Sequence, residues 1–148
     1  MIVKEIMNTR LKTAKADDMI KDVSTLMCLN KISGVPVVGD DDELIGVLSE
    51  KDILHRMFPE AHELFLNEER PNYEKMEQDF KGTLTLKVGD LMTKVVSSVS
   101  PDMPVMKAAS MMWLKKIRRI PVVEDGKLVG IVSIGDVHRA LFQEHLLS

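Results

Sequence analysis

The sequence lacks the paired cysteines typical of small secreted proteins and the long apolar runs typical of membrane proteins. It contains one cysteine, Cys28, so no internal disulfide can form. No apolar run approaches the roughly 20 residues needed to span a bilayer, and the first residues lack the pattern of a signal peptide. These absences argue against a disulfide scaffold and a membrane span, and they favour a cytoplasmic location. Cys28 itself falls in an apolar periodic segment, so we expect it in or near the core.

Neither sign of charge is in large excess, since 20 Lys and Arg stand against 23 Asp and Glu. The formal net charge is −3, which gives no overall attraction to nucleic acid or to an anionic membrane. The exception is a basic cluster made of Lys115, Lys116, Arg118 and Arg119. It is either the solvated end of a helix, where cations are favoured, or a phosphate-binding group. The four histidines show no metal-ligand spacing, so no metal site is expected.

The sequence repeats itself. KISGVPVV at 31–38 matches KIRRIPVV at 116–123, at an offset of 85 residues. ELIGVLSEKDIL at 43–54 matches KLVGIVSIGDVH at 127–138, at an offset of 84. VKEIMNT at 3–9 matches VGDLMTK at 88–94, again at an offset of 85. The change of offset falls in a turn, where a fold tolerates an insertion, so the chain is predicted to be two copies of one unit.

Each copy has the pattern of a β-α-β-β-α unit. Ile20, Val23 and Met27 follow helical spacing, and a helix is expected from about Asp17. A strand-like stretch should precede it, clearest in the second copy as VVSSV at 95–99. Two strands around an acidic turn and a closing helix from about Asp52 should follow. Because a unit of about 55 to 60 residues has little core alone, we predict an α+β fold of two repeats packed with pseudo-two-fold symmetry.

The repeats set the expected domain boundaries. The first domain should cover residues 1–60 and the second 84–148, with a helical acidic insert at 61–83 between them. We expect helix on both sides of a break near Pro71. The insert is interpreted either as a solvated linker or as a surface for a partner. An apolar side is formed by Leu64, Phe65, Tyr73, Met76 and Phe80.

A motif of the form G-h-h-S-x-x-D closes each repeat. Its residues are Gly46, Ser49 and Asp52, then Gly130, Ser133 and Asp136. A serine followed three residues later by an acid is typical of a capping box at a helix start. Capping does not require the glycine, which suggests a close backbone approach within a strand. A helix start also offers N–H donors to an anion, and both interpretations can hold together.

These features resemble the cystathionine-β-synthase (CBS) domain, here as a stand-alone tandem pair, or Bateman module. The resemblance rests on the motifs GVPVV and RIPVV, the two G-h-h-S-x-x-D motifs, and the segments ending in Met7 and Met92. The resemblance covers roughly residues 1–59 and 84–142. It implies a regulatory module that binds an adenine nucleotide or adenosyl ligand in clefts between the repeats. AMP, ADP, ATP, NAD and S-adenosylmethionine are all compatible, and no other cofactor is implied.

The resemblance also implies the residues of two sites. The first site would contain Asp136, Ser133, Ile131 and Arg118, with Lys15, Ile20, Ile32, Ser33 and Gly34 from the other copy. The second would contain Asp52, Ser49, Val47 and Lys51, with Ser100, Val105, Ile117 and Arg118 opposite. The aspartates would hold the ribose and Arg118 the phosphates. Because Arg118 corresponds to Ser33, the two sites should differ in phosphate affinity.

Two other classes of function are weighed against ligand sensing. An enzyme is not expected, because the sequence offers no nucleophile–base set and no Walker loop. The alternative is a structural or partner-binding homodimer with empty clefts. We expect a homodimer in either case, and any output must pass through an unidentified effector protein or a change in assembly. Trp113, the single tryptophan, is expected to pack at an interface of the pair or of the dimer.

Overall fold

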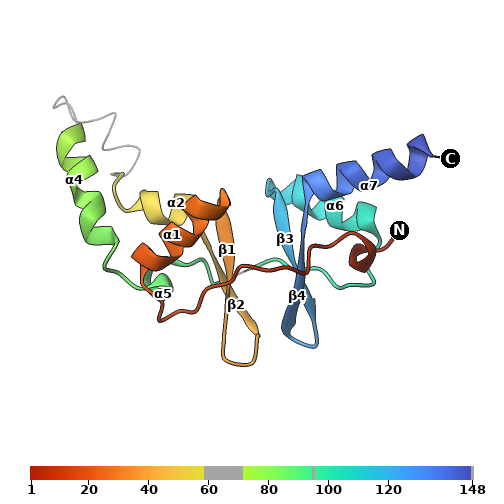
Figure 1. The fold of residues 1–148 in the computed structure, drawn as a ribbon, viewed down its shortest axis with the longest axis horizontal. Helices are drawn as coiled ribbons and strands as arrows, with labels where there is room; N and C mark the ends of the chain where they lie inside the picture. The colour runs from red at the N-terminus through yellow and green to blue at the C-terminus, as the bar shows by residue number, and fades with distance from the viewer. Residues whose placement is uncertain (59–71, 95, 148) are drawn as a thin grey trace. The chain divides into compact units, whose positions relative to one another are not determined.

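The computed structural model describes residues 1–58, 72–94 and 96–147. In the described part, the order helix, strand, strand, helix occurs twice, as the repeats predict (Figure 1). The elements are η1 (Val3–Glu5), α1 (Ile20–Asn30), β1 (Gly34–Val38), β2 (Leu44–Ser49), α2 (Glu50–His55), α4 (Tyr73–Thr83), α5 (Val88–Leu91), α6 (Val105–Lys115), β3 (Arg119–Glu124), β4 (Lys127–Ser133) and α7 (Ile134–Leu146). This mixture of helices and strands in two repeats confirms the predicted fold class.

The chain forms two compact units that exchange their leading segments. The first unit joins residues 1–12 and 38–44 to the described part of 95–148. The second unit joins 13–37 to the described part of 45–94. Each unit therefore contains the helices of one repeat together with the leading segment of the other repeat, that is, its first residues before the first long helix.

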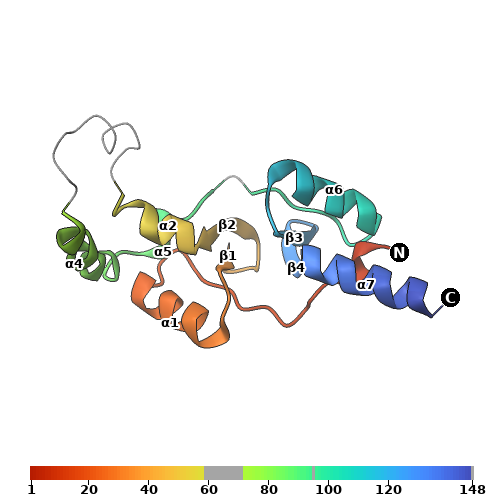
Figure 2. The same cartoon turned by 90° about the horizontal axis from the view of Figure 1, so that it is seen from above.

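The first unit is built on the β3–β4 hairpin, whose strands pair antiparallel with Pro121 opposite Ile131. Helices α6 and α7 run side by side along this unit (Figure 2). Its core combines residues of these four elements with one from η1 and one from the segment before α6. They are Val3, Val99, Val105, Ala108, Met112, Ile120, Val122, Val132 and Val137. The buried positions of α6 are Val105, Ala108 and Met112, which is the helical spacing that the sequence predicts.

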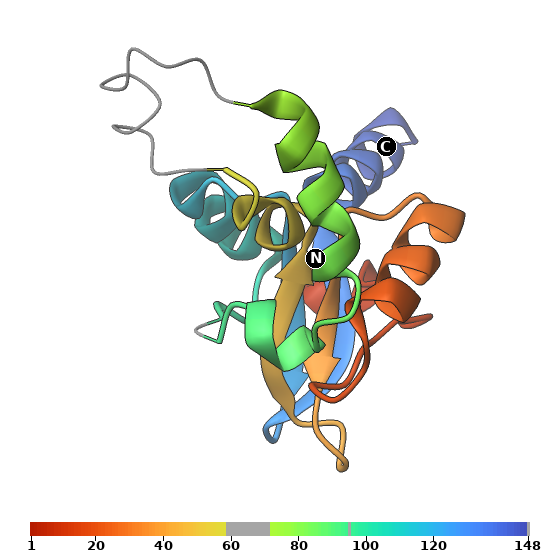
Figure 3. The same ribbon diagram turned by 90° about the vertical axis from the view of Figure 1, so that its left-hand side faces the viewer.

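The second unit repeats this plan around the β1–β2 hairpin and adds α4 and α5. Its core consists of Ala14, Ile20, Val23, Met27, Val35, Val37, Leu48, Ile53 and Val88. Figure 3 shows α4 beside α2, on the side of this unit that faces the viewer. Phe80 of α4 is half-buried and packs against the core, whereas most other side chains of α4 are exposed. The choice between a solvated linker and a partner surface stays a prediction. The expected helix before Pro71, with Leu64 and Phe65, lies outside the described residues.

The strand expected at the start of each repeat is reduced to one bridge in the described residues. Ala14 pairs in parallel with Val37, and Val99 pairs in parallel with Val122. The Val99 N–H donates to the Pro121 carbonyl at 3.0 Å, and the Val123 N–H donates to the Val99 carbonyl at 2.9 Å. Within 96–99, the described part of the predicted strand, Val99 alone is bridged, so the prediction was too long there. The expected helix starts were also early, since α1 and α6 begin at Ile20 and Val105.

Cys28 and Trp113 occupy equivalent positions, and both lie on the surface. Cys28 is exposed, so its predicted place in or near the core was wrong. Trp113 is 81% exposed, so it packs into neither core. Each residue directly follows a buried methionine, Met27 or Met112. Because successive helical residues are about 100° apart, the residue after an inward methionine turns toward the solvent.

Candidate functional site

The predicted capping box is present at the start of both closing helices. In the second repeat, the Asp136 N–H donates to Ser133 Oγ at 3.0 Å, and the Ser133 N–H donates to Asp136 Oδ2 at 2.8 Å. In the first repeat, the Ser49 N–H donates to Asp52 Oδ2 at 2.8 Å, and the Asp52 N–H donates to Ser49 Oγ at 3.3 Å. The box satisfies two helix N–H groups and fixes each carboxylate in place.

The second oxygen of each aspartate has a different partner. Asp52 Oδ1 accepts a hydrogen bond from Thr93 Oγ1 at 3.2 Å. Asp136 Oδ1 accepts one from Arg139 Nη2 at 2.6 Å, in an ion pair within α7. The sequence prediction included neither Thr93 nor Arg139. Spacing of three residues on a helix could have indicated the Arg139 pair, whereas Thr93 is 41 residues from Asp52 and has no local signal.

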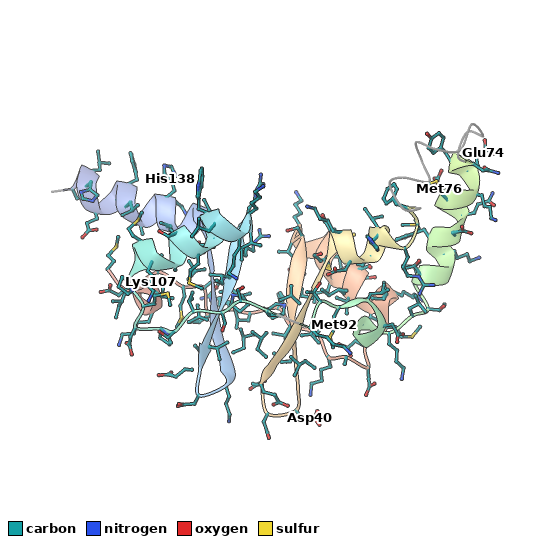
Figure 4. All side chains as sticks on the ribbon, turned by 180° about the vertical axis from the view of Figure 1, so that it is seen from behind. Asp40, Glu74, Met76, Met92, Lys107 and His138 are labelled. Atoms are coloured by element: carbon teal, nitrogen blue, oxygen red, sulfur yellow. The ribbon has the colours of Figure 1, made fainter. Side chains whose placement is uncertain are left out.

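The glycine of each motif makes room for a methionine. A Cβ on Gly46 would lie 2.9 Å from Met92 Sδ, and one on Gly130 would lie 2.6 Å from Met7 Sδ. Figure 4 shows Met92 beside the hairpin of its unit. The close approach that the glycines predicted is therefore confirmed in this structure. At Gly130 the approaching group is the Met7 side chain, and at Gly46 it is both the Met92 side chain and the Thr93 carbonyl oxygen, which would lie 2.8 Å from a Cβ.

The same segments are hydrogen-bonded to the strands that carry two predicted site residues. Val47 exchanges both backbone hydrogen bonds with Thr93, at 3.0 and 2.9 Å. Ile131 does so with Asn8, at 3.0 and 2.8 Å. Asn8 and Thr93 occupy equivalent positions in the two repeats, and so do Val47 and Ile131. The same pairing between a leading segment and a strand is therefore present twice. The N–H groups of Val47 and Ile131 are therefore already bonded, which leaves a ligand their side chains and the second lone pair of each carbonyl oxygen.

In the first unit, the residue before β3 meets the start of α7. The Ile134 N–H donates to the Arg118 carbonyl at 2.9 Å, so the predicted residues Arg118, Ser133 and Asp136 lie close together. A hollow of about 460 Å³ opens beside them. Its lining is Met112, Trp113, Lys116, Ile117, Arg118 and Ile134. Of the predicted site residues, Ile117 and Arg118 are in this lining.

The second unit has the equivalent arrangement with different chemistry. The Glu50 N–H donates to the Ser33 carbonyl at 2.9 Å. A hollow of about 250 Å³ is lined by Ser24, Met27, Cys28, Glu50, Ile53, Leu54 and Phe80. Ser33 replaces Arg118 and Glu50 replaces Ile134, so this hollow lacks the basic groups of the other one. Phe80 of α4 contributes to its wall.

The other predicted site residues divide between surface and core. Lys51 and Ser100 are exposed, and the Lys15 N–H donates to Asp18 Oδ2 at 2.8 Å just before α1. Ile20 and Val105 are 0% and 2% exposed, so the structure gives them a packing role and their contact with a ligand stays a prediction.

Each predicted site draws on residues of both units, and its assembly also stays a prediction. The first unit contains Ser100, Val105, Ile117, Arg118, Ile131, Ser133 and Asp136. The second unit contains Lys15, Ile20, Ile32, Ser33, Gly34, Val47, Ser49, Lys51 and Asp52.

Within the described residues, no three His, Cys, Asp or Glu side chains gather in a way that could hold a metal ion. Over the same part of the chain, no helix is both long and apolar enough to cross a membrane.

Two equivalent repeats of helix, hairpin and capped closing helix define a tandem-repeat protein of mixed α and β structure. The model of the CBS domain matches this chain twice, at residues 3–59 and 88–143. The chain therefore belongs to the CBS domain family, as the resemblance of its motifs indicated.

Two relatives are similar over nearly the whole chain. An uncharacterized protein of Methanocaldococcus jannaschii is 37% identical over 154 residues, which cover 95% of this chain and 91% of that protein. The crystal structure of CBSX2 in complex with AMP is 31% identical, with a TM-score of 0.75, and the match covers 97% of this chain and 98% of that one. Against the full chloroplastic CBSX2 of Arabidopsis thaliana, this chain spans 59% of the length.

An enzyme is also among the relatives. Inosine-5'-monophosphate dehydrogenase of Methanocaldococcus jannaschii is 26% identical over 138 residues, which cover 93% of this chain but 22% of the enzyme. This chain thus corresponds to a minor part of that enzyme.

Proposed function

We propose that this chain is a regulatory module that binds an adenine nucleotide or adenosyl ligand at its Ser–Asp boxes. The observation that carries the proposal is that both aspartates are held by their serines, with one oxygen directed to a second partner. A carboxylate fixed in this way can accept the two hydroxyls of a ribose. CBSX2, which is similar over nearly the whole chain, binds AMP, and this favours a nucleotide as the ligand.

The phosphate would be bound from the first unit. Arg118 is exposed, and its carbonyl is tied to the start of α7, so its guanidinium projects from a fixed point near Asp136. Arginine binds phosphate with two parallel hydrogen bonds, and the start of a helix adds favourable N–H groups. Lys116 lines the same hollow and would supply a further cation.

The expected homodimer remains part of the proposal. Trp113 and Leu114 of α6 are 81% and 80% exposed, and Phe142 and Leu146 of α7 are 59% and 64% exposed. Large apolar side chains gathered on adjacent helices mark an interaction surface. A second copy would cover them, and an effector protein would then respond to the liganded dimer. A cytoplasmic location and the absence of catalysis are likewise proposed.

Calorimetry and thermal unfolding with AMP, ADP, ATP, NAD and S-adenosylmethionine test the proposal. Asp136→Asn keeps an acceptor for the Ser133 N–H but removes the charge, so it should weaken binding by about tenfold, as hydrogen bonds to charged groups do. Asp125→Asn is the matched control, because Asp125 lies in the exposed β3–β4 turn with a φ of 52° that asparagine tolerates.

The proposal is wrong if no adenosyl ligand stabilises the wild-type chain, or if Asp52→Asn/Asp136→Asn binds as well as the wild type. A chain that forms dimers by sedimentation but binds none of these ligands would instead support the structural homodimer.

A further inference from the structure

The two aspartates differ in the residue three positions further along the helix. Arg139 follows Asp136, and His55 stands at the equivalent position after Asp52. Arg139 reaches Asp136 at 2.6 Å, whereas the oxygen of Asp52 is bonded by the neutral Thr93 hydroxyl. One carboxylate therefore carries a cationic partner and the other an uncharged one.

We propose that Arg139 determines ligand specificity at the Asp136 half-site, favouring ligands that carry a negative charge over neutral or cationic adenosyl compounds. This inference rests on the proposed function, in which Asp136 holds the ribose. A ribose hydroxyl bound to Oδ1 would share that oxygen with the Arg139 guanidinium. The guanidinium is then an immediate neighbour of any ligand that uses Asp136.

The surroundings of Arg139 leave its other donors available. Its side chain is 65% exposed, and a guanidinium has five N–H donors. A Cβ on Gly135 would lie 3.3 Å from Arg139 Nη1 and 3.6 Å from Ser133 Oγ. The arginine therefore folds back over the first turn of α7, toward the serine of the box. In the first repeat the equivalent of Gly135 is Lys51.

The charges at the two helix starts also make the Asp136 site more positive than the Asp52 site. The first turn of α7 holds Asp136 as its single acidic residue, and Arg139 neutralises it. The first turn of α2 holds two, Glu50 and Asp52, with Lys51 between them. Arg118 adds a positive charge beside α7, where Ser33 stands beside α2. An anionic ligand is thus favoured at Asp136 relative to Asp52.

The test compares AMP with adenosine, which differ by the phosphate. Asp52→Asn removes the other carboxylate, and Arg139→Gln or Arg139→Lys is added to that background. Arg139→Gln should reduce the preference for AMP over adenosine about fivefold, the size expected of an exposed charge interaction. Arg139→Lys should keep most of the preference for AMP over adenosine. In the Asp52→Asn chain, the preference for AMP over adenosine should fall as the salt concentration is raised. With Arg139→Gln added, this preference should fall less.

His55→Gln in an Asp136→Asn background is the matched control, and its preference should not change. If the Asp52→Asn chain binds both ligands but Arg139→Gln leaves the ratio unchanged, the inference is wrong and the proposed function stands. An equal loss of both ligands, with a lower unfolding midpoint in the free protein, would show a structural role only and would also overturn it. Failure of the wild-type chain to bind any adenosyl ligand would overturn the proposed function itself.

Discussion

Met7 lies so close to Gly130 that a Cβ at this glycine would be 2.6 Å from the methionine sulfur. Asn8, the next residue, exchanges two backbone hydrogen bonds with Ile131. The segment that leads the first repeat is thereby fixed to the strand that leads into Ser133 and Asp136. The contact joins chain ends that are far apart in sequence, and it ties the candidate site to the integrity of the repeat.

Gly130→Ala should destabilise the first unit by about 1–3 kcal/mol, because the added methyl overpacks a filled space. Urea unfolding measures the effect. The control is Gly82→Ala in α4, where a Cβ meets nothing within 4 Å. That change should stabilise by about 0.5–1 kcal/mol, as alanine does in a helix. Combining Gly130→Ala with Met7→Ala should recover part of the loss, and strict additivity would show that the two residues are not in contact.

The Ser–Asp box should contribute to stability as a cap. Ser133→Ala removes the oxygen that accepts the Asp136 N–H, and loss of such a cap costs about 1 kcal/mol. Ser133→Thr retains the hydroxyl and should restore most of this. Thermal and urea unfolding of the free protein provide the measurement. If Ser133→Ala is as stable as the wild type but binds ligand less well, the serine serves the ligand rather than the helix.

The sequence predicted the helical faces and the boxes well because these are local features. Met27 and Met112 follow from apolar spacing, and Asp52 and Asp136 from their distance to a serine. The exchange of leading segments could not be predicted, because pairing between Val47 and Thr93 depends on chain path rather than on neighbouring residues. The two glycines indicated a close approach without saying which group approaches.

Phe80 should be the main anchor of α4. It is half-buried against the core of the second unit, so Phe80→Ala should cost roughly 1.5–3 kcal/mol, less than for a fully buried phenylalanine. Tyr73, at the other end of α4, is 69% exposed. Tyr73→Ala should change the unfolding free energy by less than about 0.5 kcal/mol. Equal effects of the two changes would contradict the packing of α4 described above.

Arg118 should distinguish phosphorylated from unphosphorylated ligands. Arg118→Ser introduces the residue that the first repeat carries at Ser33, so it tests the asymmetry with a side chain that the fold already accepts. Because a hydrogen bond to a charged group contributes about 1.5–3 kcal/mol, AMP affinity should fall about tenfold or more. Adenosine affinity should stay within about twofold, since the ribose contact to Asp136 is retained. Calorimetry at constant ionic strength measures both. A parallel loss of adenosine binding would place Arg118 at the base or ribose, and an unchanged AMP affinity would remove it from the site.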